Sequence, residues 1–405
     1  MEWKASAPDT VKPPVFSQED GSLSIELPVA ESVGMWTGEC GVRPGRGCRV
    51  SAWADVPAEV KNNASLVLSW CRADRSLPPE QRDYVECRDD TPVLRRFDET
   101  FTVPDGCVRL EIMCMFKWRA GRTVFRDIRV DECAPLPKRM VRLAAANIKP
   151  APAATLEKNL QIFEDALAHI CRSVNDLDLI VFPECHTFRG VNASMHERAE
   201  ALPGGVTYSL CSRYAAQYRT WIVANIHEKE PNGQIHNTAF IVNREGKLHG
   251  CYRKVHLTTG EMASGIIPGT GFPVFELDFG RIGIAVCWDN WFCESARQLR
   301  LNGAELLVFP LAGDAKESHW SKTWSTRCID NSLPMVVSIC DPKVPSAILD
   351  RDGSWLAATL ERGGFAFAEI DLNERKRSFW LSVGPSFGDP YQLYIKERRP
   401  EAYSW

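Results

Sequence analysis

The spacing of apolar residues changes abruptly near residue 134, and this change constrains the fold more than any other feature of the chain. Before it, apolar and polar residues alternate, or apolar residues run for the length of a strand, as in CRVSAWADV (48–56) and ASLVLSWCRA (64–73). Proline, glycine and Asp-Asp pairs separate these runs. Several short strands at regular spacing predict an antiparallel β-sandwich over residues 1–133.

After the proline-containing segment APLPKRM (134–140), strands alternate with helices. VRLAAANI (141–148), DLDLIVFPE (176–184) and RIGIAVC (281–287) are nearly continuous apolar strands. Apolar residues recur at helical spacing between the first two of them, at Leu156, Leu160, Phe163, Leu167 and Ile170. This alternation predicts an α/β core that is covered on both faces. We therefore expect a β-sandwich domain at 1–133, a linker at 134–140 and an α/β domain with a C-terminal extension at 141–405.

Composition narrows the class of protein. The chain has 44% hydrophobic and 25% charged residues, as an ordinary soluble globular protein does, and its net charge of −4 gives no indication of a nucleic-acid partner. The segment MEWKASAPDTVKPP lacks the apolar core of a signal peptide, and no apolar run reaches the length of a membrane span. The fifteen cysteines of the chain are interpreted as mostly reduced, buried side chains. We expect a cytoplasmic protein with no membrane partner.

Three polar residues follow three apolar strands. Glu184 comes after LIVFP, Lys254 closes a predicted hairpin in YRKVHL, and Cys287 ends RIGIAV. Each has an ordinary structural explanation, as a solvated carboxylate, a loop lysine or a buried thiol. Together, an acid, a base and a thiol at neighbouring strand ends are the groups needed for covalent catalysis on a carbonyl or a nitrile.

The chemistry of these groups is complementary. A carboxylate takes the thiol proton as sulfur attacks, and a lysine orients the carboxylate and stabilises a developing oxyanion. The backbone N–H of Trp288, the residue after the cysteine, offers a second donor to that oxyanion.

These motifs resemble the nitrilase (carbon–nitrogen hydrolase) superfamily. The resemblance lies in FPE at Glu184, YRKVHL at Lys254 and CWDNWF at Cys287, in this order, and covers about residues 141–372. It implies a four-layer αββα sandwich, a thioester intermediate, no metal or organic cofactor, and assembly into a homodimer or a higher homo-oligomer. It also implies that Glu184 is the general base and acid, Lys254 the oxyanion-stabilising cation and Cys287 the nucleophile. Glu261, in GEMASGIIPG, corresponds to a second glutamate that orders the substrate and the triad, unless it is a solvated loop carboxylate.

The substrate class follows from smaller details of the same resemblance. CWDNWFCE is similar to the CWDQWFPE pattern of the N-carbamoylputrescine-amidase-like branch. In this resemblance Asp289 favours amide over nitrile chemistry and is a candidate substrate-binding residue. His319, in a Ser-His-Trp segment, is a candidate for binding a substrate carbonyl or carboxylate, or it caps the following helix. Cys293 stands where relatives have proline and is interpreted as a bystander thiol. We expect a hydrolase that releases ammonia from a small amide or N-carbamoyl amine, with nitrile hydrolysis as the alternative.

A binding function of the N-terminal half is a separate hypothesis. Residues 102–133 resemble the last strands of carbohydrate-binding-module jelly rolls. Trp36, Trp53, Trp70 and Trp118 would stack on a glycan in this interpretation, and lie in the core in the simpler one. The cysteines lack the spacing and accompanying histidines of a zinc site, and the chain has no nucleotide-binding glycine motif.

Overall fold

The computed structural model describes residues 1–56, 63–74, 79–89, 91, 93–151, 153–313, 317–341, 343–380 and 384–403. The chain divides into two compact units. The first unit is Met1–Pro137 together with Arg375–Trp405, and the second is Lys138–Glu374. The division at Pro137 lies inside the segment that the sequence marks as a linker.

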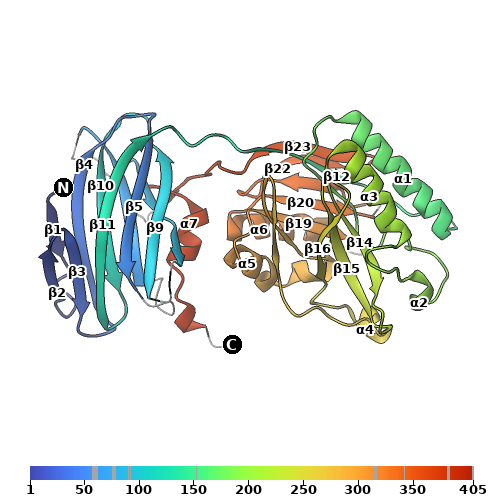
Figure 1. Cartoon of the computed structure of the whole chain (residues 1–405), viewed down its shortest axis with the longest axis horizontal. Helices are drawn as coiled ribbons and strands as arrows, with labels where there is room; N and C mark the ends of the chain where they lie inside the picture. Colours follow the sequence, from blue (N-terminus) through green and yellow to red (C-terminus); the bar gives the residue numbers. More distant parts are fainter. Residues whose placement is uncertain are drawn as a thin grey trace. The chain divides into compact units, whose positions relative to one another are not determined.

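The first unit contains two mainly antiparallel sheets that share one hydrophobic core (Figure 1). One sheet has the order β1 (Trp3–Ser6), β4 (Val33–Gly41), β10 (Cys107–Lys117), β6 (Ala64–Arg72), β7 (Gln81–Tyr84), β25 (Ser386–Gly388) and β24 (Ser378–Trp380). The other has the order β2 (Val15–Glu19), β3 (Ser22–Leu27), β11 (Gly121–Cys133), β5 (Gly47–Asp55), β9 (Leu94–Thr102) and β8 (Cys87–Asp89). Trp70 of the first sheet and Phe97 and Phe125 of the second belong to the common core. The resemblance to carbohydrate-binding jelly rolls stays a prediction.

The four tryptophans do not share one environment. Trp36 and Trp70 lie in the core, Trp53 is half-buried, and Trp118 is 39% exposed. Buried indoles cannot stack on a sugar ring, so the core interpretation holds for Trp36 and Trp70. The glycan hypothesis thereby loses half of the aromatic residues that motivated it.

Residues 375–405 belong to the first unit, which corrects the expectation that they extend the hydrolase domain. β25 pairs in parallel with β7, and β24 continues that sheet. In the helix α7 (Pro390–Lys396), Gln392 accepts the backbone N–H of Tyr84 at 2.9 Å and donates to both carboxylate oxygens of Glu99. Local sequence pattern does not reveal the partner of so short a strand, because the strand forms only by pairing with a distant one.

The second unit contains two six-stranded mixed sheets. The first, called here the β16-to-β23 sheet, has the order β16 (Leu248–Arg253), β15 (Ile235–Val242), β14 (Trp221–Lys229), β13 (Leu179–Val181), β12 (Met140–Ala146) and β23 (Phe365–Asp371). The second, the β17-to-β22 sheet, has the order β17 (Val274–Leu277), β18 (Gly280–Ile284), β19 (Leu306–Leu311), β20 (Met335–Ile339), β21 (Ser346–Leu349) and β22 (Trp355–Thr359). Strands β12, β13 and β14 run parallel, as do β18, β19 and β20.

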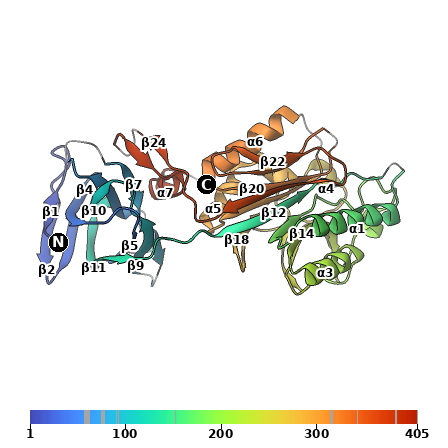
Figure 2. The same ribbon diagram turned by 90° about the horizontal axis from the view of Figure 1, so that it is seen from above.

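The two sheets of the second unit pack face to face, with helices on their outer faces (Figure 2). Val181 of one sheet and Ile284 and Val308 of the other belong to the core between the sheets. The outer helices are α1 (Leu156–Ser173) and α3 (Val206–Tyr218) on the β16-to-β23 sheet, and α5 (Cys293–Leu301) and α6 (Glu317–Asn331) on the other. The second unit therefore has the α/β architecture that the alternation of strands and helices predicts.

Local signals explain where several elements begin and end. The Thr155 side chain accepts the Lys158 N–H at 3.2 Å and caps α1. Gly303, with φ of 95°, follows α5, and Gly246, with φ of 80°, lies in the turn between β15 and β16. These positive φ angles are the reason why glycine occupies both sites.

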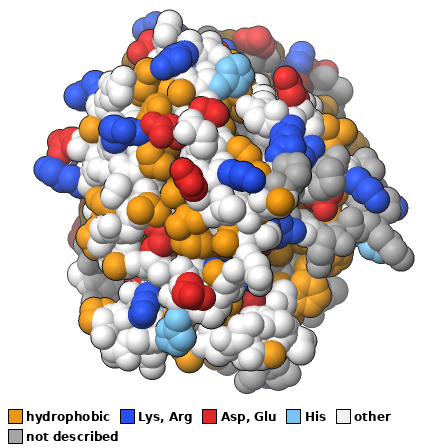
Figure 3. Space-filling view, turned by 90° about the vertical axis from the view of Figure 1, so that its right-hand side faces the viewer, with side chains coloured by type: hydrophobic (Ala, Val, Ile, Leu, Met, Phe, Trp, Pro, Cys, Tyr) orange, Lys and Arg blue, Asp and Glu red, His pale blue; other side chains and the backbone are white. Residues whose placement is uncertain are grey.

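Surface and thiol chemistry give two further observations. All fifteen cysteines are free thiols, so Cys287 and Cys293 do not form a disulfide. On the face shown in Figure 3, acidic and basic side chains are interspersed. Within the part of the chain that the structure describes, no helix is long and apolar enough to cross a membrane.

Leu393 tests the docking of the C-terminal segment. It is buried against Val67 and Tyr84, so Leu393→Ala leaves a cavity and is expected to lower the free energy of unfolding of the first unit by about 2–5 kcal/mol. Urea unfolding followed by fluorescence measures this. Leu356→Ala, at a side chain of β22 that is 44% exposed, is the control and is expected to change stability by less than about 0.5 kcal/mol. Equal stability of the two variants would contradict the docking.

Candidate active site

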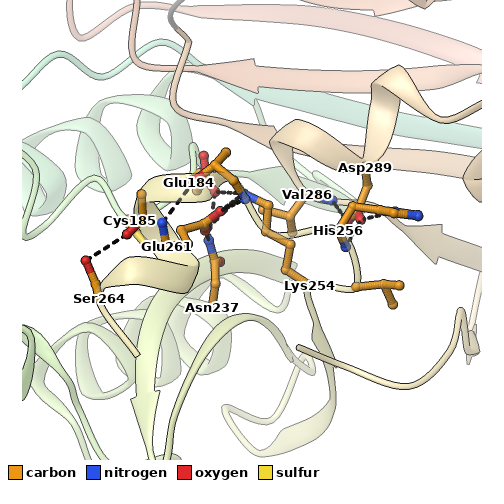
Figure 4. Close-up of polar contacts among 12 residues, drawn as sticks. Glu184, Cys185, Asn237, Lys254, His256, Glu261, Ser264, Val286 and Asp289 are labelled. Carbon is orange, nitrogen blue, oxygen red and sulfur yellow. Dashed lines mark hydrogen bonds and ion pairs between the residues drawn. The ribbon is translucent and has the colours of Figure 1, made fainter. Parts of the chain in front are cut away.

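Three segments that follow strand ends bring the predicted acid, lysine and thiol into one cavity. Figure 4 shows Glu184 and Lys254 in contact there. Glu184 follows β13, Lys254 follows β16 and Cys287 follows β18. The backbone N–H of Glu184 donates to the carbonyl of Leu311 in β19 at 3.2 Å. This bond joins the Glu184 segment to a strand of the opposite sheet, so both sheets define the site.

The ammonium of Lys254 lies at the centre of the site and is 1% exposed. It donates to Glu184 Oε1 at 2.9 Å and to Oε1 and Oε2 of Glu261, each at 3.0 Å. An ammonium group has three N–H donors, so all are engaged. Two carboxylates thus compensate the cost of burying the lysine charge and hold the side chain in one position.

Two buried asparagines extend this hydrogen-bond network. Asn237 Nδ2 donates to Glu184 Oε1 at 2.8 Å and to Glu261 Oε1 at 2.7 Å, and its Oδ1 accepts from Asn225 at 2.9 Å. Asn225 Oδ1 in turn accepts the backbone N–H and the thiol of Cys185, both at 3.0 Å. Neither asparagine is among the site residues expected from the sequence. An asparagine inside an apolar strand such as WIVANIHE is nevertheless a signal, because buried amides need partners.

Glu261 is held by the short helix α4 (Thr259–Ala263) in a capping box. The Thr258 side chain accepts the Glu261 N–H at 3.2 Å, and the Thr258 N–H donates to Glu261 Oε2 at 2.8 Å. The alternative of a solvated loop carboxylate is therefore wrong. The Thr-x-x-Glu spacing in TTGE shows this cap in the sequence.

Cys287 has a strained backbone at the start of the 3-10 helix η2 (Cys287–Trp291). Its φ is 45°, a left-handed conformation that is unfavourable for a side chain and that concentrates at functional sites. Trp288 is the second residue of η2. Because the first N–H groups of a helix have no partner inside it, the Trp288 N–H can donate to a ligand next to Cys287.

Charge and burial set the protonation states. Burial acts to raise the pKa of Glu184, but the charge of Lys254 and hydrogen bonds from Lys254, Asn237 and Cys287 keep this pKa below its ordinary value. Burial and the neighbouring Glu184 raise the pKa of the Cys287 thiol well above its ordinary value, and Lys254 and the Ala312 N–H oppose the rise. Burial acts to lower the pKa of Lys254, yet the surrounding negative charges raise it. The resting site therefore contains a carboxylate, an ammonium and a protonated thiol.

These groups line a cavity of about 300 Å³. Its described lining is Glu184, Cys185, Phe188, Arg189, Gly190, Arg198, His227, Asn237, Lys254, Thr258, Glu261, Cys287, Ala312 and Gly313. The volume is at the lower end for small-molecule sites, so the cavity suits a small substrate.

Asp289 does not reach this cavity, contrary to its expected role as a substrate-binding residue. Its side chain is fully buried and accepts the hydroxyl of Tyr252 at 2.6 Å, the Val286 N–H at 2.9 Å, and the backbone N–H of His256 at 2.9 Å. The His256 ring also lies 2.9 Å away. Asp289 therefore fixes the turn that carries Cys287, and it is a positioning residue for the thiol.

His319 is likewise outside the described lining of the cavity. It lies in the first turn of α6, is exposed, and its ring centroid is 6.4 Å from that of Trp291. Because His319 is inside the helix, it does not cap it. The capping interpretation therefore does not agree with the structure, and the substrate-binding role of His319 stays a prediction.

The chain belongs to the carbon–nitrogen hydrolase family, whose model matches residues 142–377. A probable nitrilase of Schizosaccharomyces pombe is 30% identical over 261 residues, which are 61% of this chain and 92% of that protein. An N-carbamoylputrescine amidase of Solanum lycopersicum is 33% identical over 153 residues, which are 35% of this chain and 51% of that enzyme.

The fold has solved counterparts. Nit3 of Saccharomyces cerevisiae, described as a member of branch 10 of the nitrilase superfamily, aligns with a TM-score of 0.52 at 23% identity, and the match covers 58% of this chain and 91% of that one. This likeness supports the nitrilase fold of the second unit. The chain is thus an enzyme of the class that hydrolyses carbon–nitrogen bonds.

Asp289→Ala tests the positioning role of Asp289. The substitution leaves the Tyr252 hydroxyl and two backbone N–H groups without their acceptor, and each loss costs roughly 1–3 kcal/mol. We expect a clear fall in the free energy of unfolding of the second unit, measured in urea, and a fall in kcat. A variant with unchanged stability and only a raised KM would indicate a substrate contact instead.

Proposed function

We propose that the second unit hydrolyses a small amide or N-carbamoyl amine, with Cys287 as nucleophile, Glu184 as general base and acid, and Lys254 as the cation that stabilises the oxyanion. The observation that carries the proposal is that Glu184, Lys254 and Cys287 line one cavity, in which Glu184 Oε1 accepts from Lys254 at 2.9 Å and from Asn237 at 2.8 Å. These contacts keep the pKa of Glu184 below its ordinary value, so an ionised carboxylate shares the cavity with the thiol whose proton it must take.

Acylation begins when the sulfur of Cys287 attacks the substrate carbonyl carbon and the thiol proton moves to Glu184. The carbonyl oxygen gains negative charge, which Lys254 and the Trp288 N–H stabilise. Glu184 then gives its proton to the departing nitrogen, the C–N bond breaks, and a thioester remains on Cys287.

Deacylation uses the same groups in reverse order. Water attacks the thioester carbonyl and loses a proton to Glu184. The C–S bond then breaks, and the proton returns to the sulfur, which restores the thiol. A primary amide yields ammonia and a carboxylic acid, and a ureido group yields ammonia, carbon dioxide and an amine.

Glu261 and Asn237 position the triad. Glu261 takes two of the three N–H groups of Lys254, and Asn237 joins the two glutamates. With Glu261 as a second counter-ion, Lys254 stays charged and Glu184 stays ionised. Similarity to an N-carbamoylputrescine amidase supports a ureido or amide substrate.

Nitrile hydrolysis is the second candidate, because the S. pombe relative is a probable nitrilase. The same thiol would add to a nitrile carbon. Asp289 does not decide between the two, since it is buried behind the cavity. Ammonia release from a nitrile and from the amide of the same carbon skeleton, assayed side by side, separates them. Both give the same acid and ammonia, and the nitrile consumes two waters where the amide consumes one.

Cys287→Ala tests the nucleophile. Without the sulfur no thioester forms, and we expect ammonia release from every accepted substrate to fall by at least about 10³-fold. Cys293→Ala is the matched control, because Cys293 is an exposed thiol six positions further along, and we expect it to keep nearly full activity. Mass spectrometry of the wild-type protein with substrate is expected to detect an acyl adduct on the peptide containing Cys287. Activity retained in Cys287→Ala would refute the mechanism.

The pH profile tests the charge states. Because the Glu184 pKa is lowered and the Cys287 pKa is raised, the reactive carboxylate–thiol pair persists across neutral pH. We expect kcat/KM to be flat there and to fall on the acid side only below the ordinary carboxyl pKa of 4.5, where Glu184 becomes protonated. An acid limb near about pH 6.5 would instead indicate an essential histidine. Folding is monitored at each pH by circular dichroism.

A further inference from the structure

The cavity contains two arginines that the proposed mechanism does not use. Arg189 lies in the segment after Glu184, and Arg198 is the last residue of the short helix α2 (Met195–Arg198). Both are half-buried and both line the cavity. Together with Lys254 they place three cations in the described lining, against the carboxylates of Glu184 and Glu261.

The carboxylates of the cavity are paired with Lys254, whereas its two arginines donate to backbone carbonyls. Both carboxylates already bind Lys254. Arg189 Nη2 donates to the carbonyl of Gly313 at 3.1 Å, and Arg198 Nη2 donates to that of Val191 at 2.7 Å. A carbonyl positions a guanidinium without neutralising it. Among the described residues, no carboxylate lies within the 4.0 Å ion-pair distance of either guanidinium.

Two polar atoms near Arg198 also lack partners. Arg198 Nε and His227 Nδ1 are buried and have no hydrogen-bond partner among the described residues. Arg198 and His227 are neighbours, because the Glu200 N–H, two residues after Arg198, donates to the His227 carbonyl at 2.8 Å. Arg198 Nε carries a hydrogen in every state of the side chain, so it can donate to a ligand that accepts hydrogen bonds.

We propose that Arg198, with Arg189 beside it, binds a carboxylate carried by the substrate at the end opposite to the carbonyl that Cys287 attacks. The inference rests on the proposed function and names its substrate class: an ω-amide or N-carbamoyl derivative that ends in a carboxylate. A carboxylate matches the planar fork of an arginine and accepts from the unpaired Nε–H. A substrate that ends in an ammonium meets two uncompensated positive charges.

Three substrates of equal chain length test the charge preference: an ω-ureido carboxylate, the corresponding neutral alkylurea and an ω-ureido alkylamine. We expect kcat/KM for the carboxylate to exceed that for the alkylurea by about tenfold or more, with the alkylamine lowest. Equal values for the three would overturn the carboxylate site while leaving the proposed hydrolase in place.

Variants assign the preference to Arg198. In Arg198→Gln, the ratio of kcat/KM for the carboxylate to that for the alkylurea is expected to fall to about one, mainly because KM for the carboxylate rises. Arg198→Lys keeps the positive charge but lacks the planar guanidinium fork. Its carboxylate-to-alkylurea ratio is expected to lie between that of the wild-type protein and that of Arg198→Gln. Arg172→Gln, at an exposed arginine of α1, is the matched control and is expected to keep the wild-type ratio. A ratio unchanged in Arg198→Gln would show that this arginine only holds the backbone.

A binding measurement separates this inference from the proposed function. Cys287→Ala binds without turnover, and calorimetry compares its affinity for the ω-ureido carboxylate and the alkylurea. Absence of hydrolysis in the wild-type protein would refute the proposed function, yet tighter carboxylate binding that disappears in the double variant Cys287→Ala, Arg198→Gln would still support the carboxylate site. Equal binding of the two compounds would overturn it. Cys287→Ser is the second background if the alanine variant does not fold.

Discussion

The ammonium group of Lys254 is buried between the sheets' loops, and its three N–H groups all go to Glu184 and Glu261. A buried charge is tolerated only when partners surround it, and removing one partner from such a pair typically costs about 3–5 kcal/mol. The position of Lys254 therefore depends on both glutamates, and theirs depends on it. This mutual dependence keeps Glu184 ionised beside the Cys287 thiol.

The rest of the second unit supplies the geometry for that cluster. The strands β13, β16 and β18 end where Glu184, Lys254 and Cys287 begin their loops. Asp289 then fixes the turn after the thiol by accepting from Val286, just before the thiol, and from Tyr252 and His256 of the segment that carries Lys254. A left-handed residue such as Cys287 persists only where its surroundings over-determine it, and the buried Asp289 provides this constraint.

The remaining lining of the cavity suits a role in substrate choice. Arg189 and Arg198, the cations that the proposed mechanism does not use, come from the loop and short helix between β13 and α3. A cluster of reacting groups with a separately built recognition side is a common arrangement, since loops on a rigid scaffold vary without moving the reacting atoms. Arg189 and Arg198, which the proposed mechanism does not use, are thus the residues to which we assign substrate specificity.

Much of this protein follows from its sequence alone. Strand and helix periodicity predicts an all-β region followed by an α/β domain. The positions of Glu184, Lys254 and Cys287 after apolar strands indicate the site, because strand ends are fixed by local pattern. Side-chain partners are not local. Asn237 and Glu261 meet through distant strands and α4, Asp289 turns away from the cavity that its position beside the thiol suggested, and residues 375–405 add strands to the first unit. Only tertiary packing decides these, because hydrogen-bond direction and strand pairing depend on groups far apart in the chain.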